Sequence, residues 1–550
     1  MTVQRMATEL GHAIPPEGPH TVTVHTPTWD TGIALINADQ AVMQKITSSY
    51  PRIIPFGHAQ TLCLAVHQKL ALPATYGCHI FTDPHVFSVT QEHAFSHHRK
   101  EPRLLPADMI FKVVDIAGVY LYCVGFPMAK TQGFIGVWQN FGTGVSTRLA
   151  EHLLTQVDTL VEVPFDLAGN PTATYLPETA AHQALRERIA GLLNYAPIAP
   201  QKAVAPGDIY LYPSGMAAIY GMHRAIMQVR KGPMIGLGAI FVSTYLLIYE
   251  VPDGFKHFGA CDAQSGVMDK LDAYLQSEAE AGRKVSYIFV EFPSNPLLVS
   301  VDLKRLRSLA DQYNIIVAID ITIGSFCNVD VLPVADVVVS SLTKSFSGYA
   351  DVMGGSVILN PSSRSYPALK KVYQATFHNE YFAGDAEKML ANSADYLGRS
   401  TILNRNAAAI TDLLQAHVGK VGSPVLKVLY PSVCDTAANY AAFMRPATAE
   451  FTPGYGCLLS IDFTTLAAAR AFYDNLQVNK GPHLGAHRTL AFNYNSTLGT
   501  DPEEVQYQAG YGLRREQVRI SPGLEEVSEL IEVFEDALKF AVAALQEGET

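Results

Sequence analysis

The sequence has few of the features that mark secreted, membrane-spanning or metal-binding proteins. Its 550 residues include only seven cysteines, scattered without a CxxC pair, which argues against a disulfide framework or a cysteine zinc site. The first 20 residues lack the apolar stretch of a signal peptide, and no apolar run approaches the ~20 residues that span a bilayer. We therefore expect a cytoplasmic protein without membrane contact.

Positive charge is also scarce. The formal net charge is -11, and no Lys/Arg-rich run forms a basic patch, so nucleic acid is not expected as a partner. His93, His97 and His98 include a pair at helical spacing, but the glutamate of an HExxH motif and a third ligand are lacking. We expect no metal site and small molecules as partners.

Three continuously apolar runs indicate an α/β fold. They cover residues 285–292, 315–320 and 335–342 and do not alternate, which is typical of strands buried on both faces of a parallel sheet. Between the first two, Asp302 can cap a helix with Leu303, Leu306 and Ala310 on one face, and Asn314 is suited to end it. This order predicts a βαβ unit.

Polar residues stand directly after these runs, at the sheet edge where ligands bind in such folds. Asn295 follows the first run and Asp320 ends the second, while Lys344 follows the third. A buried lysine has a lowered pKa and a nucleophilic amine, although a lysine at a strand end can also simply extend into water. Asp320 can likewise be an acid that caps the next element.

A possible anion site precedes the helical segment 215–227. Ser214, Gly215 and Met216 stand at its start, where backbone N–H groups and the helix dipole favour a dianion, although Ser214 can also be a plain N-cap. Ser341 and Thr343 can add hydroxyl donors. A lysine, an acid and a phosphate-binding helix end are the parts that pyridoxal 5′-phosphate (PLP) requires.

The chain resembles the Cys/Met-metabolism family of PLP-dependent enzymes in five motifs, which occur in the family's order at residues 213–218, 291–296, 320–322, 341–344 and 518–525. Further segments are similar to the N-terminal region of fungal cystathionine γ-synthases, at residues 19–24, 27–29, 50–52, 138–139 and 142–148. The resemblance therefore covers nearly the whole chain.

The resemblance implies a PLP-dependent transferase of the aspartate aminotransferase-like fold type I. Such a fold has a mostly parallel central sheet, a smaller C-terminal α/β domain and, here, an N-terminal extension. We accordingly expect an extension domain at 1–160, a PLP-binding large domain at 161–380 and a small domain at 381–550. A homodimer or homotetramer is implied by the resemblance alone.

The family's roles are carried over residue by residue. Lys344 resembles the catalytic Schiff-base lysine, Asp320 the partner of the ring nitrogen and Asn295 the partner of the ring hydroxyl. Tyr245 is expected to stack on the ring and assist catalysis, and Arg519 to bind the substrate α-carboxylate unless it forms a surface ion pair with Glu525 or Glu526. The remaining cofactor-binding candidates are Ser214, Gly215, Met216, Thr322, Ser341 and Thr343.

Two positions depart from the family. A neighbouring subunit's arginine usually grips the phosphate, but here Phe165-Asp166-Leu167 stands at that place, so the substitute for the clamp is open. Arg148 and His152 are candidates because they lie a short distance upstream. In addition, His483 replaces the serine of a Ser-Leu-Gly segment, which predicts an altered substrate wall with His483 in contact with the substrate.

The resemblance implies γ-replacement on an O-acyl-L-homoserine, in which the γ-acyloxy group is eliminated and a nucleophile adds at Cγ. Cysteine would give cystathionine, whereas a carbon nucleophile such as a β-keto acid would give an amino acid of secondary metabolism, and we weigh the two equally. The alternative is a catalytically weak member that serves as a structural or regulatory subunit. Retention of Lys344, Asp320 and Arg519 argues against it.

Overall fold

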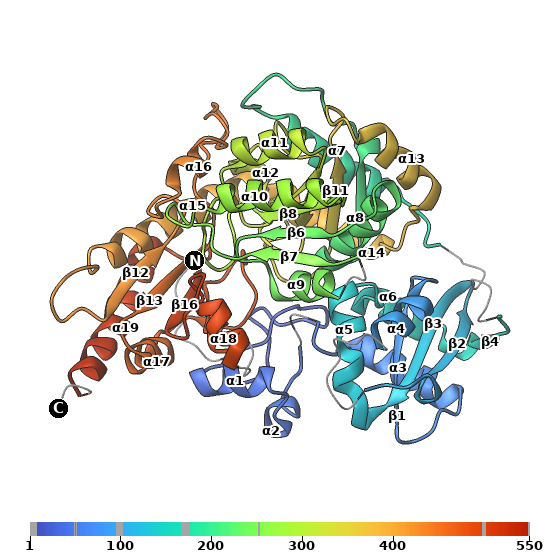
Figure 1. Ribbon diagram of the computed structural model, residues 1–550. Coiled ribbons are helices and arrows are strands. Elements are labelled where there is room, and N and C mark those ends of the chain that lie inside the picture. The colour runs from blue at the N-terminus through green and yellow to red at the C-terminus, as the bar shows by residue number, and fades with distance from the viewer. Residues whose placement is uncertain are drawn as a thin grey trace.

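Three β-sheets with their own helices organise the chain (Figure 1). The seven-stranded sheet occupies the middle, with the four-stranded N-terminal sheet on one side and the five-stranded C-terminal sheet on the other (Figure 1). The computed structural model describes residues 8–48, 50, 52–94, 103–166, 175–250, 253–497 and 502–547.

The central sheet has the strand order β5-β11-β10-β9-β8-β6-β7. Neighbouring strands are parallel except at β11, which runs antiparallel to both β10 and β5. The three apolar runs form β8, β9 and β10, so the predicted mostly parallel sheet is confirmed. The strand bounds are β5 Ile209–Tyr212, β6 Met234–Leu237, β7 Phe255–Phe258, β8 Tyr287–Glu291, β9 Ile316–Asp320, β10 Val337–Ser341 and β11 Gly355–Leu359.

Helices cover both faces of this sheet, which explains its continuously apolar strands. One face packs on α7 Ala180–Asn194, α10 Val267–Glu280 and α11 Leu303–Gln312. The other packs on α8 Gly215–Val229, α9 Val242–Tyr249 and α13 Tyr366–Thr376. The elements α12 Ser325–Asn328 and α14 Ala383–Asn392 complete this part of the chain.

The predicted βαβ unit is confirmed in detail. The side chain of Asp302 accepts a hydrogen bond from the backbone N–H of Arg305 at 3.0 Å, which caps α11. Leu303, Leu306 and Ala310 are buried on one face of the helix. Asn314 adopts a φ of 53°, a left-handed conformation that ends the helix and directs the chain into β9.

The N-terminal sheet is antiparallel, with the order β1-β3-β2-β4. Its strands and helices enclose a separate apolar core, and α5 also contacts α8 and α9 of the central layer. The bounds are β1 Tyr76–Phe81, β2 Ile110–Ile116, β3 Val119–Pro127, β4 Val161–Val163, α3 Gly57–Lys69, α4 Val86–Ala94, α5 Thr131–Phe141 and α6 Thr147–Leu154.

The C-terminal sheet has the order β12-β13-β16-β15-β14 and packs with α15, α17 and α19 around a third core. This is the smaller α/β layer that the fold prediction required. The bounds are β12 Val425–Leu429, β13 Leu459–Phe463, β14 Asn479–Lys480, β15 Leu490–Phe492, β16 Gln517–Ser521, α15 Tyr396–Gln415, α16 Ala437–Ala441, α17 Leu466–Asn475, α18 Pro502–Ala509 and α19 Val527–Glu547.

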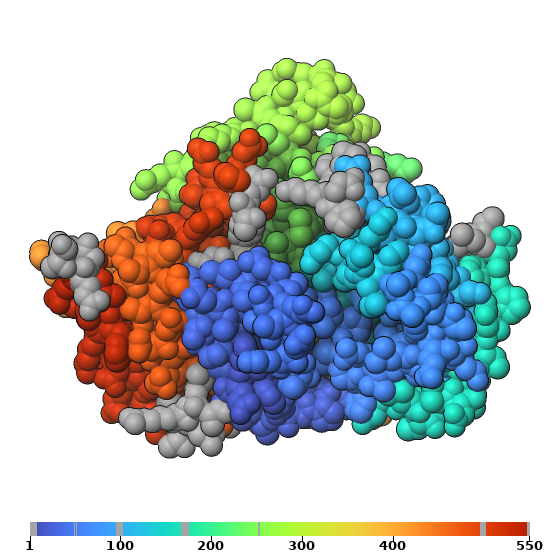
Figure 2. Space-filling model, turned by 90° about the horizontal axis from the view of Figure 1, so that it is seen from below, coloured from blue at the N-terminus to red at the C-terminus, as the bar shows by residue number. Residues whose placement is uncertain are grey.

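The N-terminal segment before α3 packs against the C-terminal layer. In α1 (Trp29–Ile36), Trp29 is buried with its ring 5.6 Å from that of Tyr473, and its carbonyl accepts a hydrogen bond from Asn493 at 3.0 Å. Figure 2 shows this segment, with α2 (Gln40–Met43), between the orange C-terminal part and the lighter blue N-terminal sheet. The domain boundaries at 160 and 380 stay a prediction.

Two further features concern the cysteines and the length of the helices. All seven cysteines are free and buried. Among the described residues, no helix has both the length and the apolar character required to cross a membrane.

Candidate active site

A cavity of about 360 Å³ lies at the carboxyl ends of β8, β9 and β10. This volume is near the lower end of the roughly 300–1,000 Å³ found for small-molecule sites. The central sheet, the first turns of α8 and α9, the C-terminal sheet and the N-terminal segment all contribute to its wall. The predicted site residues on that wall are Ser214, Gly215, Met216, Asn295, Asp320, Thr322, Ser341, Thr343, Lys344 and Arg519.

Lys344 is a buried amine beside a phenol. Burial and the nearby Arg519 guanidinium hold its pKa well below the ordinary value, which favours the neutral, nucleophilic form of the amine. Its Nζ donates a hydrogen bond to Oη of Tyr50 and lies 4.1 Å from the centroid of the Tyr50 ring. Burial raises the pKa of Tyr50 and keeps the phenol protonated. The pair combines a nucleophile with a proton carrier.

Two buried acids end neighbouring strands. Asp320 of β9 lies in register with Glu291 of β8. Burial raises the pKa of Asp320 to about 6, although hydrogen bonds from Thr322 and the nearby Lys344 favour its anion. Burial and the Asp320 charge raise the pKa of Glu291 well above its ordinary value. The two carboxyl groups therefore oppose each other's ionisation, and Glu291 holds a proton more readily than an ordinary glutamic acid does.

Glu291 was not among the predicted site residues, but it fixes two segments of the wall. Its Oε1 accepts a hydrogen bond from the backbone N–H of Phe241 at 2.6 Å, and its Oε2 accepts one from that of Asn295 at 3.1 Å. The Glu-x-x-x-Asn spacing at a strand end was visible in the sequence. The contact with Phe241 was not, because the two residues are distant in the chain.

The start of α8 fits closely onto the end of β10. A Cβ on Gly215 would lie 2.7 Å from Cβ of Ser341, so this approach requires glycine. Ser214 caps the helix: its hydroxyl accepts from the Ala217 N–H at 3.0 Å and donates to the Gly142 carbonyl at 3.0 Å. The Thr343 hydroxyl is similarly engaged, because it donates to the Gly354 carbonyl at 3.2 Å. The helix N–H groups and Ser341 thus remain as anion donors.

Arg519 of β16 presents a fixed cation to the cavity. It donates from Nη1 to Oδ1 of Asn295 at 3.2 Å and from Nη2 to the Pro482 carbonyl at 2.5 Å. Burial lowers its pKa to about 10, so it remains protonated. The alternative of an ion pair with Glu525 is wrong, since that carboxylate accepts from Thr489 instead. A rigid planar guanidinium of this kind suits a substrate carboxylate.

The stacking assignment of Tyr245 requires correction. Its ring packs on Tyr249, Phe255 and His257 and does not border the cavity. Phe241, immediately before α9, lies on the wall instead, held there by the hydrogen bond of its N–H to Glu291. The local sequence could not decide this, because one turn of helix separates the two aromatic residues.

His483 also lies behind the wall and not on it. Its ring is buried, 4.9 Å from the ring of Tyr50. Burial and the nearby charges of Lys344 and Arg519 lower its pKa well below the ordinary value. Contrary to the expectation, His483 therefore does not border the space for the substrate. It packs against Tyr50, which does border that space.

Neither candidate for the missing phosphate clamp reaches the cavity. Nη1 of Arg148 donates to Oδ1 of Asp385 at 3.2 Å, and the ring of His152 packs 5.6 Å from that of Phe382. Leu167 lies outside the described residues. A different arginine, Arg52, lines the cavity together with Tyr50. Both belong to the 50–52 segment, to which the sequence had assigned no role.

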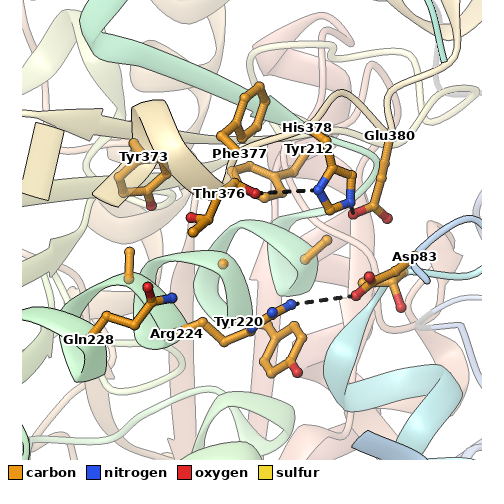
Figure 3. A pocket seen from close by; sticks show the side chains of 14 residues that line it. Asp83, Tyr212, Tyr220, Arg224, Gln228, Tyr373, Thr376, Phe377, His378 and Glu380 are labelled. Atoms are coloured by element: carbon orange, nitrogen blue, oxygen red, sulfur yellow. Dashed lines mark hydrogen bonds and ion pairs between the residues drawn. The ribbon is translucent and has the colours of Figure 1, made fainter. Parts of the chain in front are cut away.

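A second, smaller pocket of about 50 Å³ lies against α8, where the end of α13 and residues 377–380 meet Asp83 and Thr143 of the N-terminal part (Figure 3). Ligand atoms of Asp83, His378 and Glu380 lie within 4.8 Å of one another, close enough to hold a metal ion. Arg224 already contacts Asp83 at 3.7 Å, and His378 contacts Glu380 at 3.0 Å. We interpret this cluster as an ion-pair network that joins the two layers.

The structure describes only one of the three histidines at positions 93, 97 and 98. His93 forms an ion pair with Glu250 at 2.6 Å, while His97 and His98 lie outside the described residues. The expectation of no metal site stays a prediction, because neither this group nor the acidic cluster tests it.

The principal cavity fits PLP by the chemistry of its donors. An amine with a lowered pKa, an acid that can face a pyridine nitrogen and a helix N-terminus suited to a dianion meet within it, as PLP requires. A guanidinium for a carboxylate completes the set at Arg519.

Comparisons with known proteins agree with this chemistry. Cystathionine gamma-synthase of Neurospora crassa is 32% identical across 97% of this chain and 98% of its own length. Alanine racemase ungC of Aspergillus violaceofuscus is 36% identical across 76% of this chain and 74% of its own. The crystal structure of cystathionine gamma synthase from Xanthomonas oryzae pv. oryzae in complex with cystathionine shares the fold, with a TM-score of 0.51 at 21% identity, covering 67% of this chain and 100% of that one. Because the family model described as Cys/Met metabolism PLP-dependent enzyme also matches residues 202–539, the chain belongs to that family of PLP-dependent enzymes.

Proposed function

We propose that this enzyme catalyses γ-replacement on an O-acyl-L-homoserine. The observation that carries the proposal is the meeting of Lys344, whose pKa burial lowers, a protonated Tyr50 and a fixed Arg519 in one cavity. A γ-replacement needs a cation for the α-carboxylate and a base that can serve several carbons of the substrate in turn. The similarity to the Neurospora crassa enzyme over almost the whole chain supports the same reaction class.

Each of four residues has a separate role in the proposed reaction. Arg519 binds the α-carboxylate and so presents the Cα–H bond to Lys344. The amine of Lys344 would move one proton at a time: it would accept the Cα proton and pass it on to the bound substrate–cofactor adduct before accepting a Cβ proton, and would return one proton to Cβ and one to Cα after the nucleophile has added. The hydroxyl oxygen of Tyr50 accepts a hydrogen bond from Nζ of Lys344, which keeps the amine oriented. PLP, when bound, withdraws the electrons released at the substrate carbon, and the Asp320 anion maintains the ring-nitrogen proton that this requires.

The remainder of the wall is largely apolar and excludes water from this chemistry. Ile36 and Ile53 come from the N-terminal segment and Ile135 from α5, so these parts of the chain help to shape the substrate space. Exclusion of water favours transfer to the added nucleophile over hydrolysis. Both cysteine and a carbon nucleophile such as a β-keto acid are retained as acceptors within this proposal.

The test is a product analysis. Purified enzyme with PLP is incubated with O-acetyl-L-homoserine and either cysteine or a β-keto acid, and the products are identified by mass. We expect acetate release that depends on Lys344 together with one substituted amino acid. A PLP-loaded enzyme that releases no acetate with any acceptor would refute γ-replacement. A protein that binds no PLP would instead support the structural or regulatory alternative.

Racemisation is a second candidate function. The relative that is 36% identical is named an alanine racemase, and removal of the Cα proton is a step that racemisation and γ-replacement share. Lys344 and Tyr50 together supply a base and a protonated phenol for such an exchange. Incubation of L-alanine in D₂O separates the two: a racemase gives D-alanine labelled at Cα, whereas an enzyme restricted to γ-replacement accumulates no D-alanine.

A further inference from the structure

Within the part of the chain that the structure describes, Arg52 is a buried cation for which no hydrogen bond or ion pair is found. Its side chain is only 6% exposed and borders the cavity. Among the described residues, Nε and Nη2 find no hydrogen-bond acceptor. Burial alone lowers its pKa to about 9, which leaves the guanidinium charged near neutral pH. A buried charge and its N–H donors are costly when unpaired, so the arrangement is suited to a bound anion.

The protein holds Arg52 in a way that keeps its donors free. The guanidinium carbon lies 4.3 Å from the centroid of the Trp138 ring. This cation–π contact uses the face of the guanidinium, whereas the N–H groups lie in its plane and remain available. Trp138 belongs to α5, which itself packs on α8, so the arginine is fixed relative to the central layer.

Arg52 also stands close to the N-terminus of α8. The Gly142 carbonyl accepts from the Ser214 hydroxyl, and a Cβ on Gly144 would lie 2.5 Å from Nη2 of Arg52. The short segment 142–144 therefore contacts both the helix end and the guanidinium, and both border the same cavity. Tyr50, two residues before Arg52, contacts Lys344. The 50–52 segment thus extends from the reactive amine toward the anion-binding helix end.

We propose that Arg52 binds the phosphate of PLP together with the N-terminus of α8, as a clamp supplied by the same chain that supplies Lys344. The two parts complement each other, because helix N–H groups and a guanidinium are both donors to a dianion. The proposal rests on PLP as the cofactor and is independent of which nucleophile or reaction the enzyme uses.

The other arginine of the cavity does not compete for this role. Arg519 contacts Asn295 and lies on the C-terminal sheet, whereas Arg52 lies near Gly144 and the start of α8. One cation therefore serves each end of the site. If Arg52 bound a carboxylate of the substrate instead, its loss would leave the binding of PLP unchanged.

The experiment compares cofactor affinity in the full-length apo-protein. PLP and pyridoxal, which lacks the phosphate, are titrated into wild type, Arg52→Gln, Arg52→Lys and Arg148→Gln, with visible absorbance as the readout. We expect Arg52→Gln to weaken PLP about ten- to hundredfold, as for loss of a charged hydrogen bond, without a change for pyridoxal. The PLP affinity of Arg52→Lys should lie between those of wild type and Arg52→Gln. Arg148→Gln, a matched arginine that is paired with Asp385 outside the cavity, should bind as wild type does.

Two further measurements secure the interpretation. Inorganic phosphate should raise the melting temperature of apo wild type but not that of apo Arg52→Gln, and the melting temperature without ligand reports whether the variant folds. The second measurement mixes Arg52→Gln chains, which keep Lys344, with Lys344→Ala chains, which keep Arg52. If the clamp comes from the same chain as Lys344, the mixed oligomers should not regain tight PLP binding. Three results would overturn the proposal. They are wild-type PLP affinity in a folded Arg52→Gln variant, an equal loss of affinity for PLP and pyridoxal in that variant, and a return of tight PLP binding in the mixed oligomers.

Discussion

Replacement of Asp320 by asparagine tests the electrostatics of the site most directly. Burial raises the pKa of Asp320 from 3.8 to about 6, which corresponds to about 3 kcal/mol against the anion in the cofactor-free protein. A protonated pyridine nitrogen would offset that cost through a charge-assisted hydrogen bond. Asparagine retains the shape but not the charge, so the loss should be about 1.5–3 kcal/mol, or roughly ten- to 150-fold in PLP affinity.

The assay combines a PLP titration of apo-protein with single-turnover measurements on the loaded enzyme. Turnover should fall further than affinity does, because the neutral amide cannot maintain the charge that makes the ring an electron acceptor. Saturation with PLP should therefore fail to restore the rate. The two readouts separate the loss of binding from the loss of chemistry.

Glu291→Gln is the matched control, since Glu291 ends the adjacent strand in register with Asp320. Burial and the Asp320 charge raise the pKa of Glu291, so its replacement should change the charge beside the cofactor less than the replacement of Asp320 does. We expect lower thermal stability from disturbed hydrogen bonds to Phe241 and Asn295, and a smaller loss of PLP affinity than in Asp320→Asn. If Asp320→Asn binds and turns over as wild type, or if both variants lose PLP equally, the assignment of the ring-nitrogen partner is wrong.

Other predictions follow from the same site. Cofactor affinity should fall as the pH drops below about 6, because Asp320 then takes up a proton, and titrations at several pH values should show a smaller fall in Asp320→Asn. Phe241→Leu should weaken PLP about two- to tenfold by loss of the aromatic contact, whereas Tyr245→Phe should titrate as wild type; the reverse order would restore the original assignment of Tyr245. Arg519→Lys should raise KM for the amino-acid substrate more than it lowers PLP affinity, since a lysine cannot offer a planar fork, and an unchanged KM would remove the carboxylate role.

The sequence by itself determined the central layer and the chemistry at its edge. Continuous apolar runs require strands covered on both faces, and the carboxyl ends of parallel strands meet at one edge, so Asp320 and Lys344 had to come together. The helix at 303–312 was equally predictable, because Asp302 and Asn314 supply its cap and its left-handed end locally. Signals of this kind reside within a few residues of chain.

The tertiary structure alone decided which side chains complete the site. Tyr50 contacts Lys344 across nearly 300 residues of chain, and Arg52 approaches the start of α8 through the 142–144 turn; neither contact has a local pattern. The position of Phe241 on the cavity wall, in place of Tyr245, has no local pattern either. The face of α9 that borders the cavity depends on how the residue before the helix is held, and here Glu291 holds the backbone N–H of Phe241. Local sequence fixes elements and their ends because hydrogen bonding and burial act along the chain, whereas the wall of a cavity between layers is set by packing among segments that only the folded chain brings together.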